Sequence, residues 1–327
     1  MGAATTVLAI ALALTGCYAP GYVDCEVTCP GGESCPDGLR CVAGLCRIGG
    51  NTGQCGGPST GDGGPGDGVM IDGSPGVDTD GDGVSDDIDN CLMMMNPNQA
   101  NEDNDSLGDI CDPCPVSANN VDTDGDSVGD GCEPIASGTD KLLLFEGFHD
   151  PVTPAGALVL GNWTFSGGKA RNVSGVGVAS SITFPVTSPS NRRETIVARV
   201  TVDAQLSSPS DPTGAGVVSR TDTVGDIGVQ CGIGRDAVTG TDHLLLVRLA
   251  AAADSRMTSN ASNASAGTST IVSITRNPMN NAFACNQPGS TVAQIPSPIP
   301  NPASPRAGIR TRSMSASFDW VMIFETQ

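Results

Sequence analysis

Acidic side chains recur with one fixed spacing near the middle of the chain. Three stretches place oxygen-bearing side chains at loop positions 1, 3, 5, 9 and 12, and the backbone carbonyl at position 7 completes each set. Alternating carboxylates wrapped around a turn supply the about six to eight oxygen ligands that Ca²⁺ prefers. The predicted metal ligands are Asp78, Asp80, Asp82, Val84, Asp86 and Asp89 in the first loop, Asn101, Asp103, Asp105, Leu107, Asp109 and Asp112 in the second, and Asp122, Asp124, Asp126, Val128, Asp130 and Glu133 in the third.

The residues around these loops argue against an EF-hand. An EF-hand requires an amphipathic helix on each side of its loop, whereas Cys and Pro flank the loops here. Position 6, where glycine is favoured, holds Gly83 in the first loop but Ser106 and Ser127 in the other two, so we expect weaker binding there. A disordered acidic tail is the simpler alternative, but the regular alternation and the interleaved cysteines disfavour it.

The flanking residues closely resemble thrombospondin type 3 repeats. That family has almost no hydrophobic core, and calcium ions and disulfides form its interior. The resemblance covers residues 78–133 and implies the pairs Cys91–Cys111 and Cys114–Cys132, although Leu92 stands where the family usually has Pro. The residues that carry it are Asp89-Asn90-Cys91, Asn96-Pro97-Asn98-Gln99, Gly108-Asp109-Ile110-Cys111-Asp112 and Cys114-Pro115.

Two short motifs in this block have plainer explanations. Residues 125–129 match the G-x-S-x-G pattern of a nucleophilic serine. That motif requires a hydrophobic strand before it and a helix after it, and acidic loop surrounds it here, so chance explains it better. Met93, Met94 and Met95 could bind Cu(I), but adaptable packing beside a disulfide is the better account.

The cysteines indicate an oxidising compartment. Apart from Cys17 they occur in even numbers per segment, a pattern typical of local disulfides. Six of them crowd a short N-terminal segment that is too small to fold on a hydrophobic core alone. We expect a protease-resistant spacer, with a recognition module or a zinc site as alternatives, and their pairing stays open. These six are Cys25, Cys29, Cys35, Cys41, Cys46 and Cys55.

The N-terminus predicts export. Residues 7–14 form an apolar run too short to span a bilayer but suited to a signal peptide. Leu14-Thr15-Gly16-Cys17 resembles the lipobox of bacterial lipoproteins, which implies lipidation of Cys17 and anchoring in the outer membrane of a Gram-negative cell. The segment before the apolar run departs from that pattern because it lacks Lys and Arg. An ordinary secretory signal and N-myristoylation at Gly2 are the alternatives.

Charge is concentrated in one part of the chain. The net charge is −20 over 327 residues, and residues 72–140 hold 18 acidic side chains and no basic one. This balance argues against nucleic-acid binding, which requires Lys and Arg to neutralise phosphates. With two His in the whole chain, a His-based catalytic centre has few candidates.

From Lys141 onward the sequence predicts a mostly β fold. Short β-prone runs alternate with Gly, Pro, Asn and Ser, which favours an antiparallel β-sandwich. Ala250–Ala253 is the only helix-like stretch, and Asn286–Pro305 reads as a long loop. The predicted strands are Leu142–Phe148, Val176–Phe184, Thr195–Val202, Ala215–Ser219, Ile227–Ile233, His243–Leu249, Thr270–Thr275, Ala307–Arg312 and Ser315–Phe324.

The ends of this segment resemble the concanavalin A-like (laminin-G/glucanase) jelly roll. Residues 145–148 and 163–168 are similar to its first strands, and residues 308–312 and 317–321 to its last. The fold includes lectins and glycoside hydrolases, but the hydrolase string E-x-D-x-x-E is absent from the sequence. Trp163 and Trp320 are expected in the core. A disulfide between Cys231 and Cys285 is expected to join two strands.

Together these features predict five segments and a non-enzymatic role. A calcium-stiffened stalk would present a β-sandwich that binds a glycan or a surface protein or mediates adhesion, and the alternative is an extracellular glycoside hydrolase with its site in the sandwich groove. We expect calcium removal to expand the acidic block and leave the sandwich folded. The segments are a signal peptide (1–16), a disulfide-rich module (17–47), a Gly-rich linker (48–77), calcium repeats (78–133) and the sandwich (141–327).

Overall fold

The computed structural model describes two separate parts of the chain. They belong to two compact units, Met1–Gly73 and Ser74–Gln327. In the first unit the described residues form an antiparallel hairpin of β1 (Leu39–Val42) and β2 (Leu45–Ile48), with the backbone of Cys41 opposite that of Cys46 in the strand register. The predictions for the signal peptide, for Cys17, for the pairing of the six N-terminal cysteines and for the linker lie outside the described residues. The described ranges are 39–42, 45–48, 77–173, 175, 177–186, 191–205, 214–235, 242–251, 254–262 and 267–326.

Residues 77–139 form turns and bends with neither helix nor strand. The segment is rich in Asp, Asn and Gly, whose short side chains bond to nearby backbone and favour turns over regular structure. Two disulfides close it, Cys91–Cys111 and Cys114–Cys132, which confirms the pairing that the repeat resemblance implied. Cys114 is fully buried and Cys91 is 3% exposed, so the disulfides lie in the interior of the segment.

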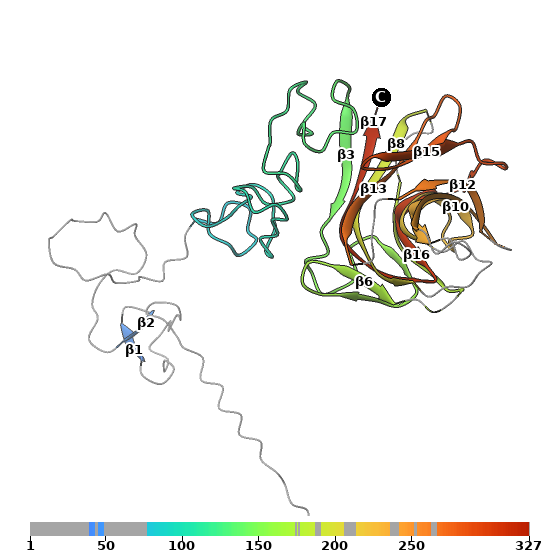
Figure 1. Ribbon diagram of the computed structural model, residues 1–327. Coiled ribbons are helices and arrows are strands. Elements are labelled where there is room, and N and C mark those ends of the chain that lie inside the picture. The colour runs from blue at the N-terminus through green and yellow to red at the C-terminus, as the bar shows by residue number, and fades with distance from the viewer. Residues whose placement is uncertain are drawn as a thin grey trace, which may run out of the picture. The chain divides into compact units, whose positions relative to one another are not determined.

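Residues 140–326 fold into two antiparallel sheets, which confirms the predicted β-sandwich (Figure 1). The seven-stranded sheet contains, in spatial order, β12 (Ser255–Ala261), β11 (Asp242–Ala250), β10 (Ile227–Arg235), β9 (Gly214–Thr221), β16 (Arg306–Arg312), β7 (Ala179–Pro185) and β4 (Leu158–Leu160). The eight-stranded sheet contains β15 (Ser290–Gln294), β14 (Phe283–Gln287), β13 (Ser269–Arg276), β8 (Arg193–Gln205), β17 (Met314–Thr326), β6 (Ala170–Val173), β5 (Trp163–Phe165) and, paired with β17 outside this order, β3 (Asp140–Glu146).

Two expectations about the sandwich were wrong. Ala250 ends β11, and the described residues around it are not helical. The stretch expected to be a long loop, Asn286–Pro305, contains β15, which forms a hairpin with β14. Ser290–Gln294 carries only two β-branched residues, Thr291 and Val292, so cross-strand pairing with β14 rather than local propensity makes it a strand.

The core lies between the two sheets. Its side chains come from alternate positions of facing strands, as the two-residue period of a strand requires. On β17 the inward set includes Phe318, Val321 and Ile323, all at most 2% exposed. The disulfide Cys231–Cys285 joins β10 of one sheet to β14 of the other, so the predicted link between two strands is also a link between the sheets.

A second hydrophobic cluster covers the other face of the eight-stranded sheet. Trp320, Met322 and Phe324 alternate with the inward residues of β17, and each is at most 2% exposed. They are covered by Val128 of the third acidic loop, itself 1% exposed, together with neighbouring partly buried side chains. The third loop is therefore packed against the sandwich rather than attached only through the chain. Among the described residues there is no helix that could span a membrane.

Candidate metal centres and a polar pocket

The structure brings acidic oxygens together in each of the three loops. In every group one ligand atom per residue lies within 4.8 Å of the others. Groups of this kind form because the loop backbone turns around its own side chains. The groups are Asp78, Asp80 and Asp82 in the first loop, Asp103, Asp105 and Asp112 in the second, and Asp122, Asp124, Asp126 and Glu133 in the third.

Four of the predicted ligands, three from these groups and Asn101, have a side-chain oxygen that is buried without a hydrogen-bond partner in the structure. These oxygens are Oδ2 of Asp80, Oδ1 of Asn101, Oδ2 of Asp103 and Oε1 of Glu133. Burial of a carboxylate without a partner is strongly unfavourable, and it becomes favourable when a cation is held. Three groups of hard oxygen donors with no soft ligand fit Ca²⁺ rather than a transition metal.

Backbone N–H groups hold the remaining oxygens in place. In the first loop Asp78 accepts hydrogen bonds from the N–H groups of Gly81 and Gly83, at 2.8 and 3.0 Å. Asp122 repeats this in the third loop with Gly125 and Ser127, at 2.7 and 2.9 Å. These bonds orient the position 1 carboxylate, and in the third loop they lower the pKa of Asp122.

The carboxylate at position 5 connects each loop to the segment that follows it. One oxygen accepts the N–H of position 7, at 2.8 Å in the first loop, 2.6 Å in the second and 2.9 Å in the third. The other oxygen accepts from a residue further along the chain. These distal donors are the N–H of Asn96 for Asp82, the side-chain amide of Asn120 for Asp105, and the N–H of Asp140 for Asp126.

The predicted ligands at position 9 point to the backbone of the loop start. Asp86 accepts from the N–H and hydroxyl of Thr79 at 2.8 and 2.7 Å, and Asp130 accepts from Thr123 at 2.8 and 2.7 Å. Asp109 accepts the N–H of Glu102 at 2.7 Å. None of the three belongs to the convergent groups. At position 9 such loops often reach the ion through a water molecule. With or without an ion, the hydrogen bonds of these carboxylates join position 9 to position 2 of the same loop.

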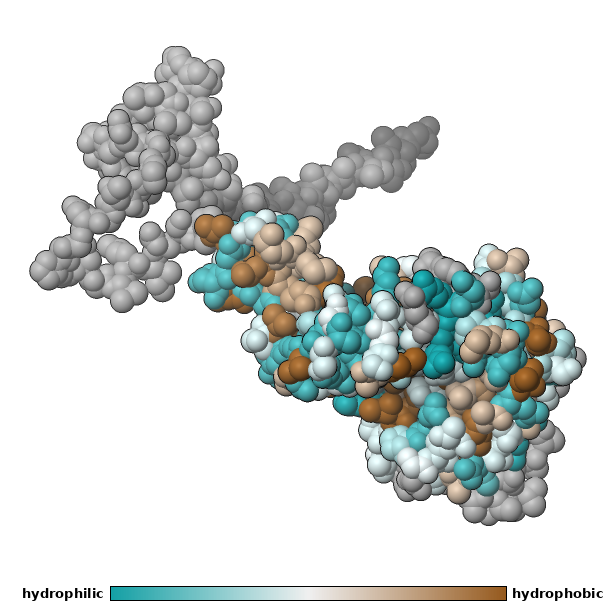
Figure 2. All heavy atoms as spheres, turned by 90° about the horizontal axis from the view of Figure 1, so that it is seen from above, coloured by the Kyte–Doolittle hydropathy of each residue, from teal (hydrophilic) through white to brown (hydrophobic). Residues whose placement is uncertain are grey.

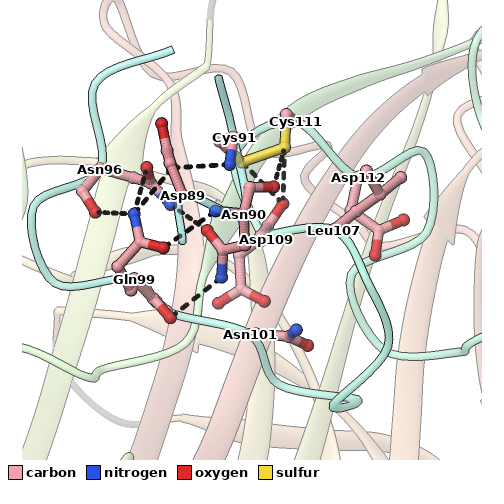
Figure 3. The surroundings of a disulfide bond; sticks show 12 residues. Asp89, Asn90, Cys91, Asn96, Gln99, Asn101, Leu107, Asp109, Cys111 and Asp112 are labelled. Atoms are coloured by element: carbon pink, nitrogen blue, oxygen red, sulfur yellow. Dashed lines mark hydrogen bonds between the residues drawn. A yellow bond between two sulfur atoms is a disulfide. The ribbon is translucent and has the colours of Figure 1, made fainter. Parts of the chain in front are cut away.

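Position 12 differs between the loops. Asp112 and Glu133 join the groups of their own loops. Asp89 instead accepts bonds from the N–H of Cys91 and the amide of Gln99, both at 2.8 Å, beside the Cys91–Cys111 disulfide (Figure 3). Gln99 in turn accepts the N–H of Asn90 at 2.9 Å. This amide network was not predicted as part of the site. The Asn-Pro-Asn-Gln string between the loops was its only sequence signal.

Burial and neighbouring like charges raise the pKa values of several loop carboxylates. Burial, and then the carboxylates of Asp105, Asp103 and Asp109, raise the pKa of Asp112 to about 6. Burial followed by neighbouring carboxylates also raises the pKa values of Asp80 and Glu133. An added cation would reverse these shifts because it stabilises the ionised form.

The loops have left-handed backbone at position 4 and, in the first and third, also at position 6. The backbone is left-handed at position 4 in all three loops, with φ of 80° at Gly81, 61° at Asn104 and 81° at Gly125. At position 6, Gly83 and Ser127 have φ of 95° and 77°. A left-handed serine is strained relative to glycine, so the third loop accepts a turn that its sequence disfavours.

The second and third loops also contact the sandwich through polar groups. Asp124 accepts the N–H of Gly138 at 2.9 Å, and Asp126 accepts the N–H of Asp140, the first residue of β3. In the second loop, Glu102 and Asp109 each place an oxygen 3.4 Å from Nε2 of His149, which follows β3. These two carboxylates raise the pKa of His149 to about 10, so the imidazole is charged at neutral pH.

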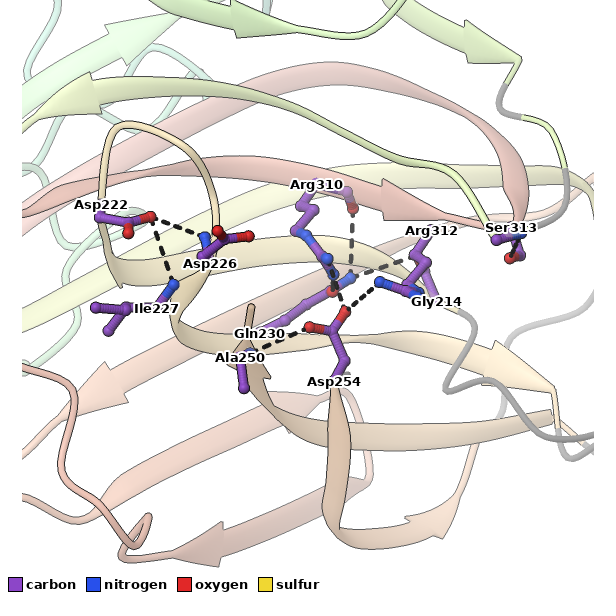
Figure 4. Close-up of polar contacts among 11 residues, drawn as sticks. Gly214, Asp222, Asp226, Ile227, Gln230, Ala250, Asp254, Arg310, Arg312 and Ser313 are labelled. Carbon is purple, nitrogen blue, oxygen red and sulfur yellow. Dashed lines mark hydrogen bonds and ion pairs between the residues drawn. The ribbon is translucent and has the colours of Figure 1, made fainter. Parts of the chain in front are cut away.

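A separate polar pocket of about 160 Å³ lies on the seven-stranded sheet. Arg310 is bonded to Asp254 at 2.7 Å and to Gln230 at 2.6 Å, and Arg312 lies 3.1 Å from the same Asp254 oxygen (Figure 4). The side chains of Arg310 and Asp254 are 5% and 3% exposed. Such a buried, mutually satisfied group presents oriented polar atoms to a small ligand. No feature of the sequence predicted it.

The two tryptophans occupy the core-type positions that were expected. Trp320 is buried in the second cluster, under the third loop. Trp163 packs against the main core, with its ring 6.0 Å from that of Phe318 and its N–H donated to the carbonyl of Leu160. Neither lines the polar pocket, so neither is placed to stack on a ligand bound there.

Comparison with known proteins gives a fold-level likeness only. No family model matches the chain, and no curated protein matches it. Among solved structures, peanut lectin in complex with a 9mer peptide is 12% identical with a TM-score of 0.43, covering 57% of this chain and 97% of its own. The CBM2 module of the evolved Dit of Lactobacillus casei BL23 phage J-1 is 11% identical with a TM-score of 0.40, covering 57% and 96%. The carbohydrate-binding module CBM66 from Bacillus subtilis is 13% identical with a TM-score of 0.37, covering 50% and 91%.

Proposed function

We propose that this chain is a calcium-binding protein whose three acidic loops are stiffened by Ca²⁺ and hold a β-sandwich head. The observation that carries this proposal is the set of buried, unpartnered oxygens of Asp80, Asn101, Asp103 and Glu133, which lie in the three loops. Eighteen acidic side chains without a basic one in residues 72–140 add a strong electrostatic demand for cations.

The ions would be held by oxygen donors of the loops themselves. In the first loop Asp78, Asp80 and Asp82 would bind, in the second Asn101 with its three grouped aspartates, and in the third the grouped aspartates with Glu133. The carbonyls of Val84, Leu107 and Val128 remain predicted ligands. When bound, calcium supplies positive charge that neutralises the carboxylates and fixes the turns, so metal binding contributes folding free energy.

Counting bound calcium tests the proposal. Native mass spectrometry and calorimetry of the full chain should give about three Ca²⁺ per chain, one for each loop, with Mg²⁺ held more weakly because of its stricter geometry. A variant carrying Asp80→Asn, Asp103→Asn and Asp124→Asn should lose uptake. Asp87→Asn is the matched control, because Asp87 is exposed and outside the three groups. Absence of calcium uptake at millimolar concentration would refute the proposal.

A second candidate function is recognition of a sugar at the polar pocket of the seven-stranded sheet. The pocket is small compared with the about 300–1,000 Å³ of drug-sized sites, and it suits a terminal sugar ring. Arg312 and Ser181 line it beside the buried Arg310–Asp254 pair. A glycan array with the full chain tests this role. Arg312→Gln should abolish any signal, whereas Arg256→Gln outside the pocket should leave it unchanged.

We do not favour hydrolysis at that pocket. A glycosidase needs two carboxylates in different protonation states. The pocket lining contains two carboxylates, Asp226 and Asp254, and Asp254 is already bonded to both Arg310 and Arg312. Lipid anchoring through Cys17, placement at the outer membrane and a role in adhesion remain predictions from the sequence.

A further inference from the structure

Strand β3 lies at an edge of the eight-stranded sheet. It pairs with β17 over Glu146 to Asp140, and in the described part of the chain no strand pairs with its other side. In an antiparallel pair, alternate residues point their N–H and C=O groups away from the partner. Residues 142–146 are all partly exposed, so this unpaired edge is accessible. An accessible edge is a template for one more strand.

The free edge lines a cleft of about 730 Å³ between the sandwich on one side and the second acidic loop with the segment before it, residues 95–100, on the other. Residues 142–147 form one side. The opposite side includes Met95 and Ile110, which are 58% and 53% exposed. On the face seen in Figure 2, hydrophobic side chains appear in separate small patches among hydrophilic ones. The cleft therefore combines backbone bonding groups on one side with apolar contacts on the other.

The charge of the lining restricts the partner. Asp109, Asp112, Glu146 and Asp150 contribute acidic groups. Asp109 faces His149 and Asp112 belongs to the second metal group, so Glu146 and Asp150 carry the acidic charge left for a partner when calcium is bound. His149 is the one basic side chain in the lining, and it is already placed between Glu102 and Asp109. A second copy of this chain would bring the same acidic groups against one another, which is unfavourable. The acidic side chains of the lining attract a basic segment electrostatically, whereas they do not attract an acidic or a neutral one.

We propose that this cleft binds an extended, basic polypeptide segment, which adds as a strand to the free edge of β3. Backbone hydrogen bonds to residues 142–146 would bind the segment in more than one register, because every residue offers the same backbone groups. Its Lys or Arg side chains would lie close to the acidic side chains of the cleft. At about 3.4 Å per residue, the seven-residue strand offers an edge of about 24 Å. This site is independent of the polar pocket on the seven-stranded sheet.

The test uses the full chain at saturating Ca²⁺ and a capped ten-residue peptide of alternating lysine and valine. We expect saturable binding by fluorescence anisotropy, with slower hydrogen exchange confined to residues 141–146. A glutamate–valine peptide should bind at least about tenfold more weakly. The lysine–valine peptide with N-methyl groups on every residue should also lose binding, because neither of its edges then donates backbone hydrogen bonds.

Two substitutions test whether the peptide binds in the cleft. Met95→Lys adds a like charge to an exposed wall position and should weaken the basic peptide at least about fivefold. Met279→Lys is the matched control, since Met279 is 88% exposed on the loop between β13 and β14, outside the cleft lining.

The proposal is overturned by no binding of the basic peptide at millimolar concentration, by equal binding of both peptides, or by equal loss of binding in the two methionine variants. Self-association through β3 without peptide uptake would identify a second copy as the occupant and would equally overturn it. Calcium uptake is measured on the same sample, so a failure of calcium binding is distinguished from a failure of peptide binding.

Discussion

At the scale of single residues, the loop carboxylates divide into two kinds. Some have an oxygen that is buried without a partner, as in Asp80 and Asp103. Others have their oxygens taken up by backbone groups, as in Asp86 with Thr79. Both kinds are spaced alike in the sequence. Asp80 and Asp103 also belong to the converging groups of their loops, whereas Asp86 does not, so the two kinds should respond differently to substitution.

The first prediction separates these two roles within one loop. Asp80→Asn should weaken calcium binding at the first loop by at least about tenfold, because it removes a charged ligand. Asp86→Asn should have a smaller effect on affinity, since the amide oxygen can still accept from Thr79, and should mainly loosen the loop start. Site-resolved NMR titration with Ca²⁺ measures both. Equal losses of affinity would show that Asp86 is itself a ligand.

The second prediction concerns pH. Burial raises the pKa of Asp112 from its ordinary value of 3.8 to about 6. The stability that this shift contributes is fully present below pH 3.8 and is lost as the pH rises through about 6. Calcium requires the ionised carboxylate, so affinity at the second loop should fall about tenfold per pH unit below 6. Calcium titrations of the second loop at pH 5, 6 and 7.5 test this. Asp112→Asn should flatten the dependence.

At the scale of structural elements, position 7 has a different role in each loop. Val84 and Leu107 are only partly buried, whereas Val128 packs on Trp320, Met322 and Phe324 of β17. Position 7 therefore packs the third loop against the eight-stranded sheet. The position 7 residues of the first two loops do not belong to that hydrophobic cluster. The sheet face that Val128 covers would otherwise expose large hydrophobic side chains.

The third prediction uses this difference. Val128→Ala removes buried methyl groups and should lower the free energy of unfolding by about 2 kcal/mol. Val84→Ala, at the same position of the first loop, should lower it by less than about 0.5 kcal/mol, as for a surface site. Chemical denaturation at saturating calcium gives both values. Similar effects of the two substitutions would contradict the packing of the third loop on β17.

At the scale of the whole molecule, the acidic segment and the sandwich belong to one compact unit and contact each other directly. The third loop contributes Val128 to a cluster on β17, and its Asp126 accepts the N–H of Asp140 at the start of β3. The second loop holds His149 between two carboxylates. The sandwich keeps its own core between the sheets, so loss of the loops should weaken it without unfolding it.

The fourth prediction is that calcium removal reaches into the sandwich. Chelation should expand residues 78–133 and also expose Trp320, because the loop that covers it loses its fixed turns. In a Trp163→Phe background the remaining Trp320 emission should shift to the red, and hydrogen exchange should quicken in Met322 to Phe324 and in β3. Exchange in β10 and β11 should change little. An unchanged Trp320 spectrum after complete chelation would contradict this coupling.

The sequence by itself determined the local features of this protein. Spacing alone indicated the loop ligands, because a twelve-residue turn brings its own side chains together whatever surrounds it. The repeat resemblance gave the pairs Cys91–Cys111 and Cys114–Cys132, and alternation of β-prone residues with turn residues gave most strands of the sandwich.

Only the tertiary structure decided which of these features meet. Arg310 and Asp254 are 56 residues apart and pair because β16 lies within the seven-stranded sheet. Val128 is one of three equivalent valine or leucine positions, and only its packing on β17 distinguishes it. The strand at Ser290–Gln294 and the open edge of β3 likewise depend on which strand finds which partner. Long-range pairing and burial are properties of the assembled sheets, so local spacing carries no record of them.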